Sequence, residues 1–276
     1  MPTAPPVWAK LCSKRSSSAK ASVLVSHTHN LIFLKSRKTA GTSVEMFLQQ
    51  VCGITQGPPS EKTAAVVNQR GIVGRRKNAR PNLLWWRNKW QNHLSSTQMR
   101  AYLGEPRWQS ASKVTTVRNP FDRMLSGFYW RLRKADRQAP AALPELRAAV
   151  EDFILNSDFP DDRDIFFDNG SFVPDQCLRY EHLESDLAAL CDAHNIETAN
   201  TSLPRTKATG TARGDFALAD FFTPRAVDAV LRNYDWSFER FGYAPSPDQT
   251  EPADNVMQPV AQTQLHQPIP TQGSKQ

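Results

Sequence analysis

The sequence has few cysteines and no long apolar run, and each absence excludes a class of protein. Four cysteines occur in 276 residues (Cys12, Cys52, Cys177 and Cys191), and none are spaced as a CxxC metal or redox motif. So few cysteines in a chain of this length do not form a disulfide framework, and they indicate free thiols in a reducing compartment. No stretch approaches ~18 consecutive apolar residues, so we predict no transmembrane helix.

A secretory signal is also missing from the N-terminal segment. Residues 1–22 contain basic side chains, but no apolar segment follows them. We therefore expect a cytoplasmic protein whose residues 1–22 are disordered. Residues 244–276 are rich in proline and glutamine, and they contain too few apolar side chains to offset the entropy of ordering. We expect disorder there too, so the folded domain is predicted to span residues 23–243.

Basic residues outnumber acidic ones, 34 to 27, which gives a formal net charge of +7. This excess favours an anionic partner, such as a nucleotide, a nucleic acid, an acidic glycan or a membrane surface. The charge alone does not choose among them. Apolar residues make up 39% of the chain, enough for a sizeable core.

Two strand-to-helix units stand out in the hydrophobic pattern. Residues 30–34 form an apolar run typical of a buried strand, and apolar residues recur at helical spacing over 44–51. Residues 114–117 are rich in β-branched side chains, and a helix over 121–132 follows, with Asn119 as its expected cap. Further helices are expected over 95–104, 144–156, 183–194 and 227–238, with a short strand over 176–180. Alternating strands and helices predict an α/β domain with a mostly parallel sheet, and ligands bind beyond the carboxyl ends of such strands.

The loop between the first strand and its helix has the composition of a phosphate site. Small residues allow backbone N–H groups to approach an anion, and the helix N-terminus adds favourable partial charge. Lys38 supplies a full positive charge, and Thr39, Thr42 and Ser43 supply hydroxyls. The loop does not match GxxxxGK[ST], because its lysine precedes Gly41. A nucleotide kinase or NTPase is therefore the weaker alternative.

Four segments of the chain resemble the PAPS-dependent sulfotransferases. Residues 31–43, ending Arg37-Lys38-Thr39-Ala40-Gly41-Thr42-Ser43, resemble the family's 5′-phosphosulfate loop PKTAGTS, with Arg37 in place of the proline. Residues 117–126 resemble VRNPxDRxxS, residues 178–186 resemble RxENLxxD, and the stretch ending at Tyr243 resembles DxxxFGY. The similarity is greatest to the carbohydrate branch, which includes bacterial enzymes and heparan sulfate 2-O-sulfotransferase.

The resemblance implies a P-loop-like three-layer fold, PAPS as the sulfuryl donor, PAP as the product and no metal. Lys38 would contact the 5′-phosphosulfate and stabilise the charge that builds on the bridging oxygen as the S–O bond breaks. Arg118 and Ser126 would bind the 3′-phosphate, for which a guanidinium fork is well suited. Arg123 is a weaker candidate for that phosphate, or a partner for Asp122. The residues expected to bind the donor are therefore Lys38, Thr39, Ala40, Gly41, Thr42, Ser43, Arg118 and Ser126.

A base must also take the proton from the acceptor hydroxyl. A histidine with an ordinary pKa near 6.5 is mostly neutral at cytoplasmic pH, as this role needs. His93 precedes a capped helix, and a catalytic histidine occupies a comparable place in the 2-O-sulfotransferase branch. We expect His93 to be the base, with Glu45 as the competing candidate and a surface or capping histidine as the plainer interpretation.

The basic insertion over residues 56–92 could hold the acceptor, expected to be a carbohydrate and, given the charge, an anionic one. Trp85, Trp86 and Trp90 could stack on sugar rings among the arginines, or they could be core residues beside a solvated face. A nucleic-acid-binding protein that uses residues 70–90 is a further alternative, but no RNA-binding fold signature accompanies the patch. Lys207 and Thr209 resemble a family segment that closes over the donor.

Overall fold

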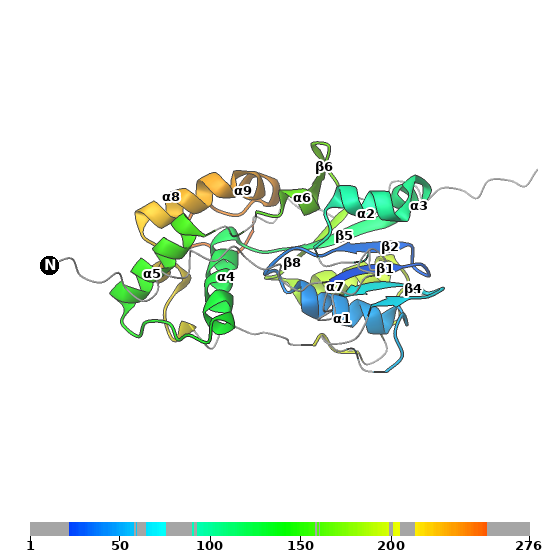
Figure 1. The fold of residues 1–276 in the computed structure, drawn as a ribbon, viewed down its shortest axis with the longest axis horizontal. Helices are drawn as coiled ribbons and strands as arrows, with labels where there is room; N and C mark the ends of the chain where they lie inside the picture. The colour runs from blue at the N-terminus through cyan, green and yellow to red at the C-terminus, as the bar shows by residue number, and fades with distance from the viewer. Residues whose placement is uncertain are drawn as a thin grey trace, which may run out of the picture.

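We analysed a computed structural model of the chain. It describes residues 22–57, 59, 65–75, 90, 93–157, 159, 161–198, 201–204 and 213–252. The main sheet within these residues has the strand order β3-β4-β1-β2-β5-β8 (Figure 1). Its strands are β1 (Ser22–Ser26), β2 (Leu31–Leu34), β3 (Val66–Val67), β4 (Gly71–Arg75), β5 (Ser112–Val117) and β8 (Gln176–Arg179).

The half of this sheet that β2, β5 and β8 form is parallel. β2 pairs with β5, and β5 pairs with β8, both in parallel register. β1 runs antiparallel to β2 and to β4, and β3 pairs antiparallel with β4. The carboxyl ends of β2, β5 and β8 therefore meet at one edge, where a ligand site is expected.

Helices cover both faces of the sheet, which makes three layers (Figure 1). α1 (Gly41–Val51) and α7 (Leu183–Ala193) pack on one face, where Leu31 and Phe33 of β2 are buried. α2 (Ser96–Leu103) and α3 (Glu105–Ser110) pack on the other, where Ile32 and Leu34 are buried. Successive strand residues point to opposite faces, so the continuous apolar run of β2 matches a strand covered on both sides.

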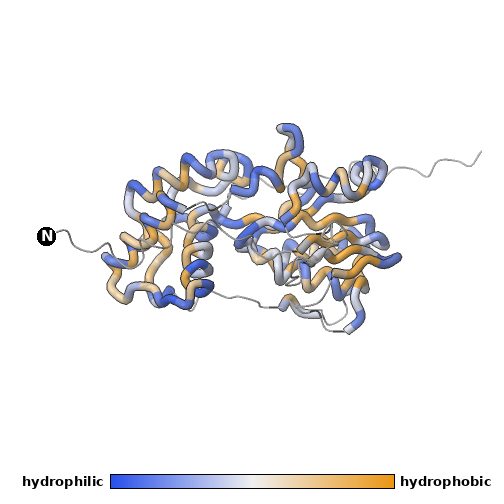
Figure 2. Tube along the Cα trace, in the orientation of Figure 1, coloured by the Kyte–Doolittle hydropathy of each residue, from blue (hydrophilic) through white to orange (hydrophobic). Residues whose placement is uncertain are grey.

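A helical region lies beyond the carboxyl ends of the parallel strands, on the left in Figure 1. Apolar residues follow one side of each of its helices in the hydropathy view (Figure 2). Phe121, Phe128 and Phe153 belong to its largely aromatic core. Its elements are α4 (Pro120–Lys134), α5 (Leu143–Asn156), the 3₁₀ helix Leu218–Phe221, α8 (Pro224–Asn233) and α9 (Asp235–Phe241). Beside α2, at the top in Figure 1, lie α6 (Arg163–Phe166) and the hairpin of β6 (Phe167–Asp168) and β7 (Ser171–Phe172).

The structure confirms the α/β fold class, with a central sheet flanked by helices. It also confirms the expected cap of α4, in which Asn119 accepts from the N–H of Phe121, and the capped start of the helix after His93, where Ser95 and Gln98 form a reciprocal capping box. The single helix expected over 227–238 is wrong, because α8 ends at Asn233 and α9 begins at Asp235. Tyr234 between them has φ −121°, outside the helical range, and its ring is buried.

β1, β3 and β4 were not predicted. β3 and β4 form a hairpin inside the basic insertion, where short strands at a sheet edge carry little hydrophobic signal. Among the helices of the described residues, none is long and apolar enough to cross a membrane.

Replacing Phe121 by alanine should lower the free energy of unfolding by about 3–5 kcal/mol. The Phe121 ring is fully buried and lies 5.2 Å from that of Phe222 and 5.4 Å from that of Phe238, centroid to centroid. Denaturant unfolding measures the change. Val67→Ala is the control, because Val67 is 64% exposed and should change stability by less than about 0.5 kcal/mol. Equal effects of the two substitutions would contradict this assignment of the core.

Candidate active site

The loop that joins β2 to α1 lies beside the residue that follows β5. The parallel pairing of β2 with β5 brings the two segments to the same edge of the sheet. Arg118 donates from Nη1 to the backbone oxygen of Lys38 over 3.1 Å. Two motifs that are 80 residues apart in sequence are thus in direct contact.

The backbone of the loop is shaped to bind an anion. Lys38 and Ala40 have positive φ values of 65° and 63°, whereas Thr39 between them does not. Alternation of this kind turns successive N–H groups toward a common point. Ala40 is the N-cap of α1, and among the described residues no side chain caps that helix start. The first N–H groups of α1 are therefore suited to a negatively charged group.

The hydroxyl of Thr39 anchors the loop to the sheet. Its Oγ1 lies 2.7 Å from Oγ of Ser36 and 2.6 Å from Oγ1 of Thr116 on β5. All three side chains are buried. The contribution of Thr39 to an anion would therefore come from its backbone, while its side chain holds the loop in place.

A buried ion pair supports the loop from below. Lys35 Nζ lies 2.8 Å from Glu45 Oε2, and both side chains are less than 5% exposed. Gln49 donates to the other oxygen of Glu45. The Lys35 side chain passes close to Gly41, where an added Cβ would lie 2.8 Å from its Cγ, so only glycine fits there. Sequence reasoning missed Lys35, because a lysine directly after a strand is usually exposed.

Lys38 is partly exposed, and its ammonium faces an aromatic ring. Nζ lies 5.7 Å from the centre of the Trp130 ring on α4. Lys134, one turn further along α4, places its Nζ 5.3 Å from the same ring. A cation–π contact of this kind contributes about 0.5–1 kcal/mol at an exposed site, so it leaves the lysine able to move to a stronger anionic partner.

Arg118 is buried and held in a fixed orientation. Its Nε lies 2.6 Å from Asp122 Oδ2, and its guanidinium stacks 3.8 Å from the Tyr180 ring centre. Asp122 also pairs with Arg213. Burial alone would raise the pKa of Asp122, but the two arginines outweigh it and lower that pKa below its usual value. Ser126, the other expected phosphate ligand, is buried on α4 nearly two turns after its start.

Two further segments of the predicted motifs meet at Asn119. Its backbone N–H donates to Glu181 Oε1 over 2.8 Å, and Tyr243 donates its hydroxyl to Oε2 of the same carboxylate over 2.9 Å. The Asn119 side chain donates to the backbone oxygen of Gln249 over 3.2 Å. Burial raises the pKa of Glu181, although hydrogen bonds and Arg118 oppose the shift. The segments that contain Glu181 and Tyr243 thus hold the residue next to Arg118.

His93 lies against the start of the loop. Its Nδ1 is 2.9 Å from the backbone oxygen of Lys35. A carbonyl oxygen only accepts, so Nδ1 carries the proton and Nε2 has the lone pair. Burial, reinforced by Arg37, lowers the pKa of His93 to about 3, while Asp162 and the bond to Lys35 oppose the shift. The ring is therefore neutral at pH 7 and able to accept a proton at Nε2.

The structure places other predicted residues outside the site. Trp90 is buried and packs edge-on against Tyr102, so it is a core residue. Arg123 donates to Asp162 and to the backbone oxygen of Arg37, whereas Asp122 pairs with Arg118 and Arg213. Outside the described residues lie Trp85, Trp86, most of the basic side chains of the insertion, Lys207 and Thr209.

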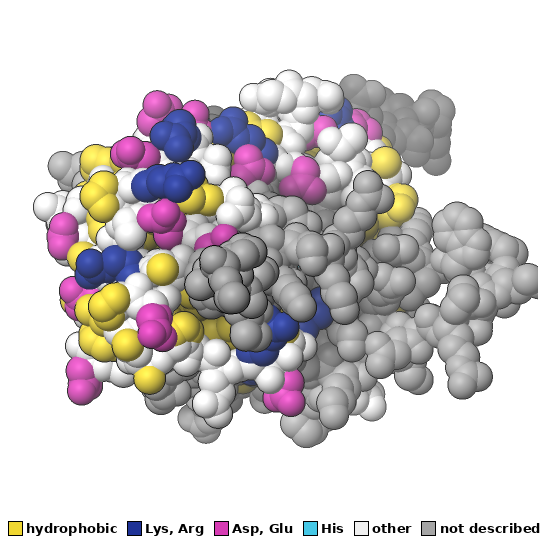
Figure 3. Space-filling view, turned by 60° about the vertical axis from the view of Figure 1, so that its left-hand side comes forward, with side chains coloured by type: hydrophobic (Ala, Val, Ile, Leu, Met, Phe, Trp, Pro, Cys, Tyr) yellow, Lys and Arg dark blue, Asp and Glu magenta, His cyan; other side chains and the backbone are white. Residues whose placement is uncertain are grey.

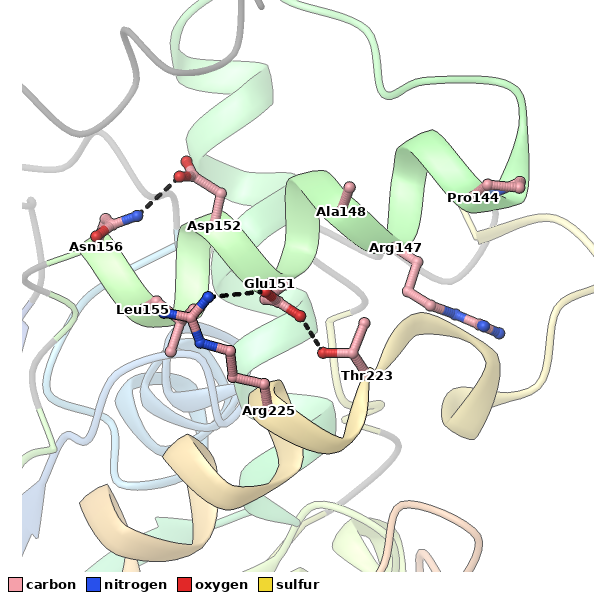
Figure 4. A pocket seen from close by; sticks show the side chains of 9 residues that line it. All are labelled: Pro144, Arg147, Ala148, Glu151, Asp152, Leu155, Asn156, Thr223 and Arg225. Atoms are coloured by element: carbon pink, nitrogen blue, oxygen red, sulfur yellow. Dashed lines mark hydrogen bonds and ion pairs between the residues drawn. The ribbon is translucent and has the colours of Figure 1, made fainter.

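A separate groove of about 340 Å³ lies between α5 and the start of α8 (Figure 4). Glu151 bonds with Thr223 and Arg225, and Asp152 bonds with Asn156. Lysines, arginines and acidic residues are interspersed over this end of the molecule (Figure 3). Because the residues that line the groove include none of the Lys38 loop and neither His93 nor Arg118, we do not include it in the site. In the part of the chain that the structure describes, no group of three or more His, Cys, Asp or Glu residues could hold a metal ion.

One of the comparisons with known proteins finds a match, and it covers the part of the chain that contains the candidate site. A model of the sulfotransferase family matches residues 21–157. No curated protein and no solved structure matches the chain. The matched region contains the Lys38 loop, His93, Arg118 and Ser126. The match supports a sulfotransferase family for this chain, with transfer of a sulfuryl group as its general chemistry.

Proposed function

We propose that this protein transfers a sulfuryl group from PAPS to a hydroxyl of a carbohydrate acceptor and releases PAP. The observation that carries the proposal is the contact between two anion-binding elements. The uncapped start of α1 with Lys38 lies against Arg118, whose Nη1 is 3.1 Å from the Lys38 carbonyl. A donor with phosphate groups at two ends accounts for both elements.

Donor binding follows from the groups present. The backbone N–H groups of the loop and Lys38 would hold the 5′-phosphosulfate at the helix start, where a negative charge is stabilised. Arg118 and Ser126 would hold the 3′-phosphate. The ion pair with Asp122 fixes the guanidinium before the donor arrives, so little side-chain entropy remains to be lost on binding.

Transfer needs a base on one side and a cation on the other. The acceptor oxygen attacks sulfur, the bond from sulfur to the bridging phosphate oxygen breaks, and the acceptor proton goes to Nε2 of His93. Lys38 leaves the Trp130 ring to stabilise the charge on the departing oxygen. A bound anionic donor would raise the low pKa of His93 and make it a stronger base.

The competing base, Glu45, fits less well. Its carboxylate is 1% exposed and bonds with Lys35 and Gln49 beneath the loop. A buried carboxylate that is already bonded to two side chains is poorly suited to take a proton from an acceptor that binds from solvent. An acidic carbohydrate as acceptor is supported by the motif resemblance and by the net charge of +7.

Lys38→Ala should lower kcat about 10²- to 10³-fold, because the charge on the leaving oxygen would lose its cation. The measurement is transfer of radiolabelled sulfate from PAPS to a panel of glycans. Lys134→Ala is the matched control, since Lys134 contacts the same Trp130 ring but lies outside the loop. The control should retain near wild-type activity. Failure of the wild-type protein to bind PAP in calorimetry would refute the proposed function.

His93→Asn should lower kcat about 10²- to 10⁴-fold and leave the dissociation constant of PAP nearly unchanged. The asparagine amide can still donate to the Lys35 carbonyl but cannot accept a proton. Single-turnover kinetics with saturating PAPS separates the chemical step from binding. Retention of more than about a third of the wild-type rate would assign the base to another residue.

The low pKa of His93 also predicts how stability depends on pH. The folded protein keeps this ring neutral down to about pH 3. The unfolded chain protonates it below about pH 6.5, so stability is lost as pH falls below 6.5. Between pH 7 and pH 5 the wild type should lose about 1–2 kcal/mol more than His93→Gln, as measured by urea unfolding. The other histidines contribute equally to both proteins, and parallel pH profiles would contradict the assignment.

A further inference from the structure

Asp162 lies fully buried beside the phosphate loop and belongs to none of the four motifs. Its Oδ2 accepts a hydrogen bond of 2.6 Å from the backbone N–H of Arg37 and one of 2.7 Å from Arg123 Nη2. Its Oδ1 pairs with the Arg37 guanidinium. The Asp162 side chain is 0% exposed. A buried carboxylate with two guanidinium partners and an amide partner is fully compensated for the loss of water.

Arg123 also holds the backbone of Arg37, and we call Asp162 and Arg123 together the Arg37 clamp. Its Nε donates to the backbone oxygen of Arg37 over 2.9 Å, and its Nη1 donates to the backbone oxygen of Asp161 over 3.2 Å. The N–H and the C=O of Arg37 are thus both fixed. These groups belong to the two peptide planes that lead directly into Lys38.

The amide link to Asp162 depends on the departure from the motif at position 37. The resembled loop has proline there, and proline has no N–H to donate. Arg37 supplies that N–H and also a guanidinium, and Asp162 accepts from both. Arg37 and Asp162 therefore form a matched pair 125 residues apart in sequence.

The Arg37 clamp also connects the loop to α6 and α2, and α2 begins shortly after His93. Asp162 precedes α6, and its backbone oxygen accepts from the N–H of Ile165 over 2.8 Å. Ser96, at the start of α2, donates to the backbone oxygen of Ile165. His93 lies three residues before Ser96, so Asp162 is connected both to the loop and to the helix that follows the histidine.

We propose that Asp162 is a positioning residue that sets the conformation of the phosphate loop through the backbone of Arg37. The proposal rests on the proposed function for its effect on the donor, but its effect on the loop is independent of any donor. Asp162 touches no reacting atom and acts through Arg37 and Arg123.

The first test is a double-mutant cycle on PAP binding with Asp162→Asn and Arg37→Pro. Each single substitution should raise the dissociation constant of PAP about tenfold, as expected for loss of a hydrogen bond to a charged group. Proline removes the N–H of this link and asparagine removes the charge of its acceptor, so the double variant should also be weakened about tenfold rather than about a hundredfold. Asp164→Asn is the matched control, since Asp164 is 3.9 Å from Arg37 Nη1 but 54% exposed, and it should change binding less than about twofold. Additive effects in the cycle, or an Asp162→Asn variant that binds like the control, would overturn the proposal.

A second pair of variants covers the case in which Asp162→Asn does not fold. Arg37→Ala and Arg37→Pro both remove the guanidinium, but only proline removes the N–H. Proline should weaken PAP binding about tenfold more than alanine, and equal binding by the two would also overturn the proposal.

Amide hydrogen exchange separates this inference from the proposed function. If the wild type does not bind PAP, the function fails, but the loop can still be examined. Asp162→Asn should exchange the amides of residues 37–41 at least tenfold faster than Asp164→Asn does. Equal exchange in the two variants would show that Asp162 does not set the loop.

Discussion

The parallel pairing of β2 with β5 determines the arrangement of everything at the candidate site. It places Phe33 opposite Val114 and Leu34 opposite Thr115. Thr115 donates its hydroxyl to the Leu34 carbonyl over 2.7 Å, and the hydroxyl of the next residue, Thr116, bonds with that of Thr39 over 2.6 Å. A slip by one residue would turn each of these threonines to the other face of the sheet and would separate the loop from Arg118. The register of two buried strands is therefore the constraint on which the anion site depends.

Much of the fold and the two anion-binding segments could be predicted because their signals are local. A buried strand, small residues and a periodic helix occur consecutively around Lys38, and Asn119 and Pro120 mark the start of α4. The partners that hold these segments could not be predicted in the same way. Asp162 is 125 residues from Arg37, and it lies in a polar stretch with no periodicity that would indicate burial. The mixed sheet confirms the fold class, and the family match over residues 21–157 supports sulfuryl transfer as the general chemistry, while the roles of Lys38, His93 and Arg118 remain proposals.

Several buried charged side chains lie next to the Lys38 loop, and each of them forms an ion pair. Lys35 with Glu45, and Asp162 with Arg37 and Arg123, replace water by fixed partners. Such pairs contribute little net stability, since apolar residues of similar volume often serve as well. Their value lies in geometry, because removing one member leaves an uncompensated charge in the interior. The loop has few alternative conformations that would keep all of these groups paired.

Asn119, next to Arg118, is held by residues that are synthesised much later in the chain. The carboxylate that receives its N–H is held by Tyr243, and its side-chain amide donates to Gln249, near the end of the described chain. Residues 22–134, with the loop and α4, leave the ribosome long before these partners exist. A nascent chain can form the β2–β5 pair early, but Asn119 reaches its final environment only when Tyr243 and Gln249 have been made. The candidate site would therefore be complete only after synthesis has passed Gln249, and a product truncated before Tyr243 would lack the contacts that hold Asn119.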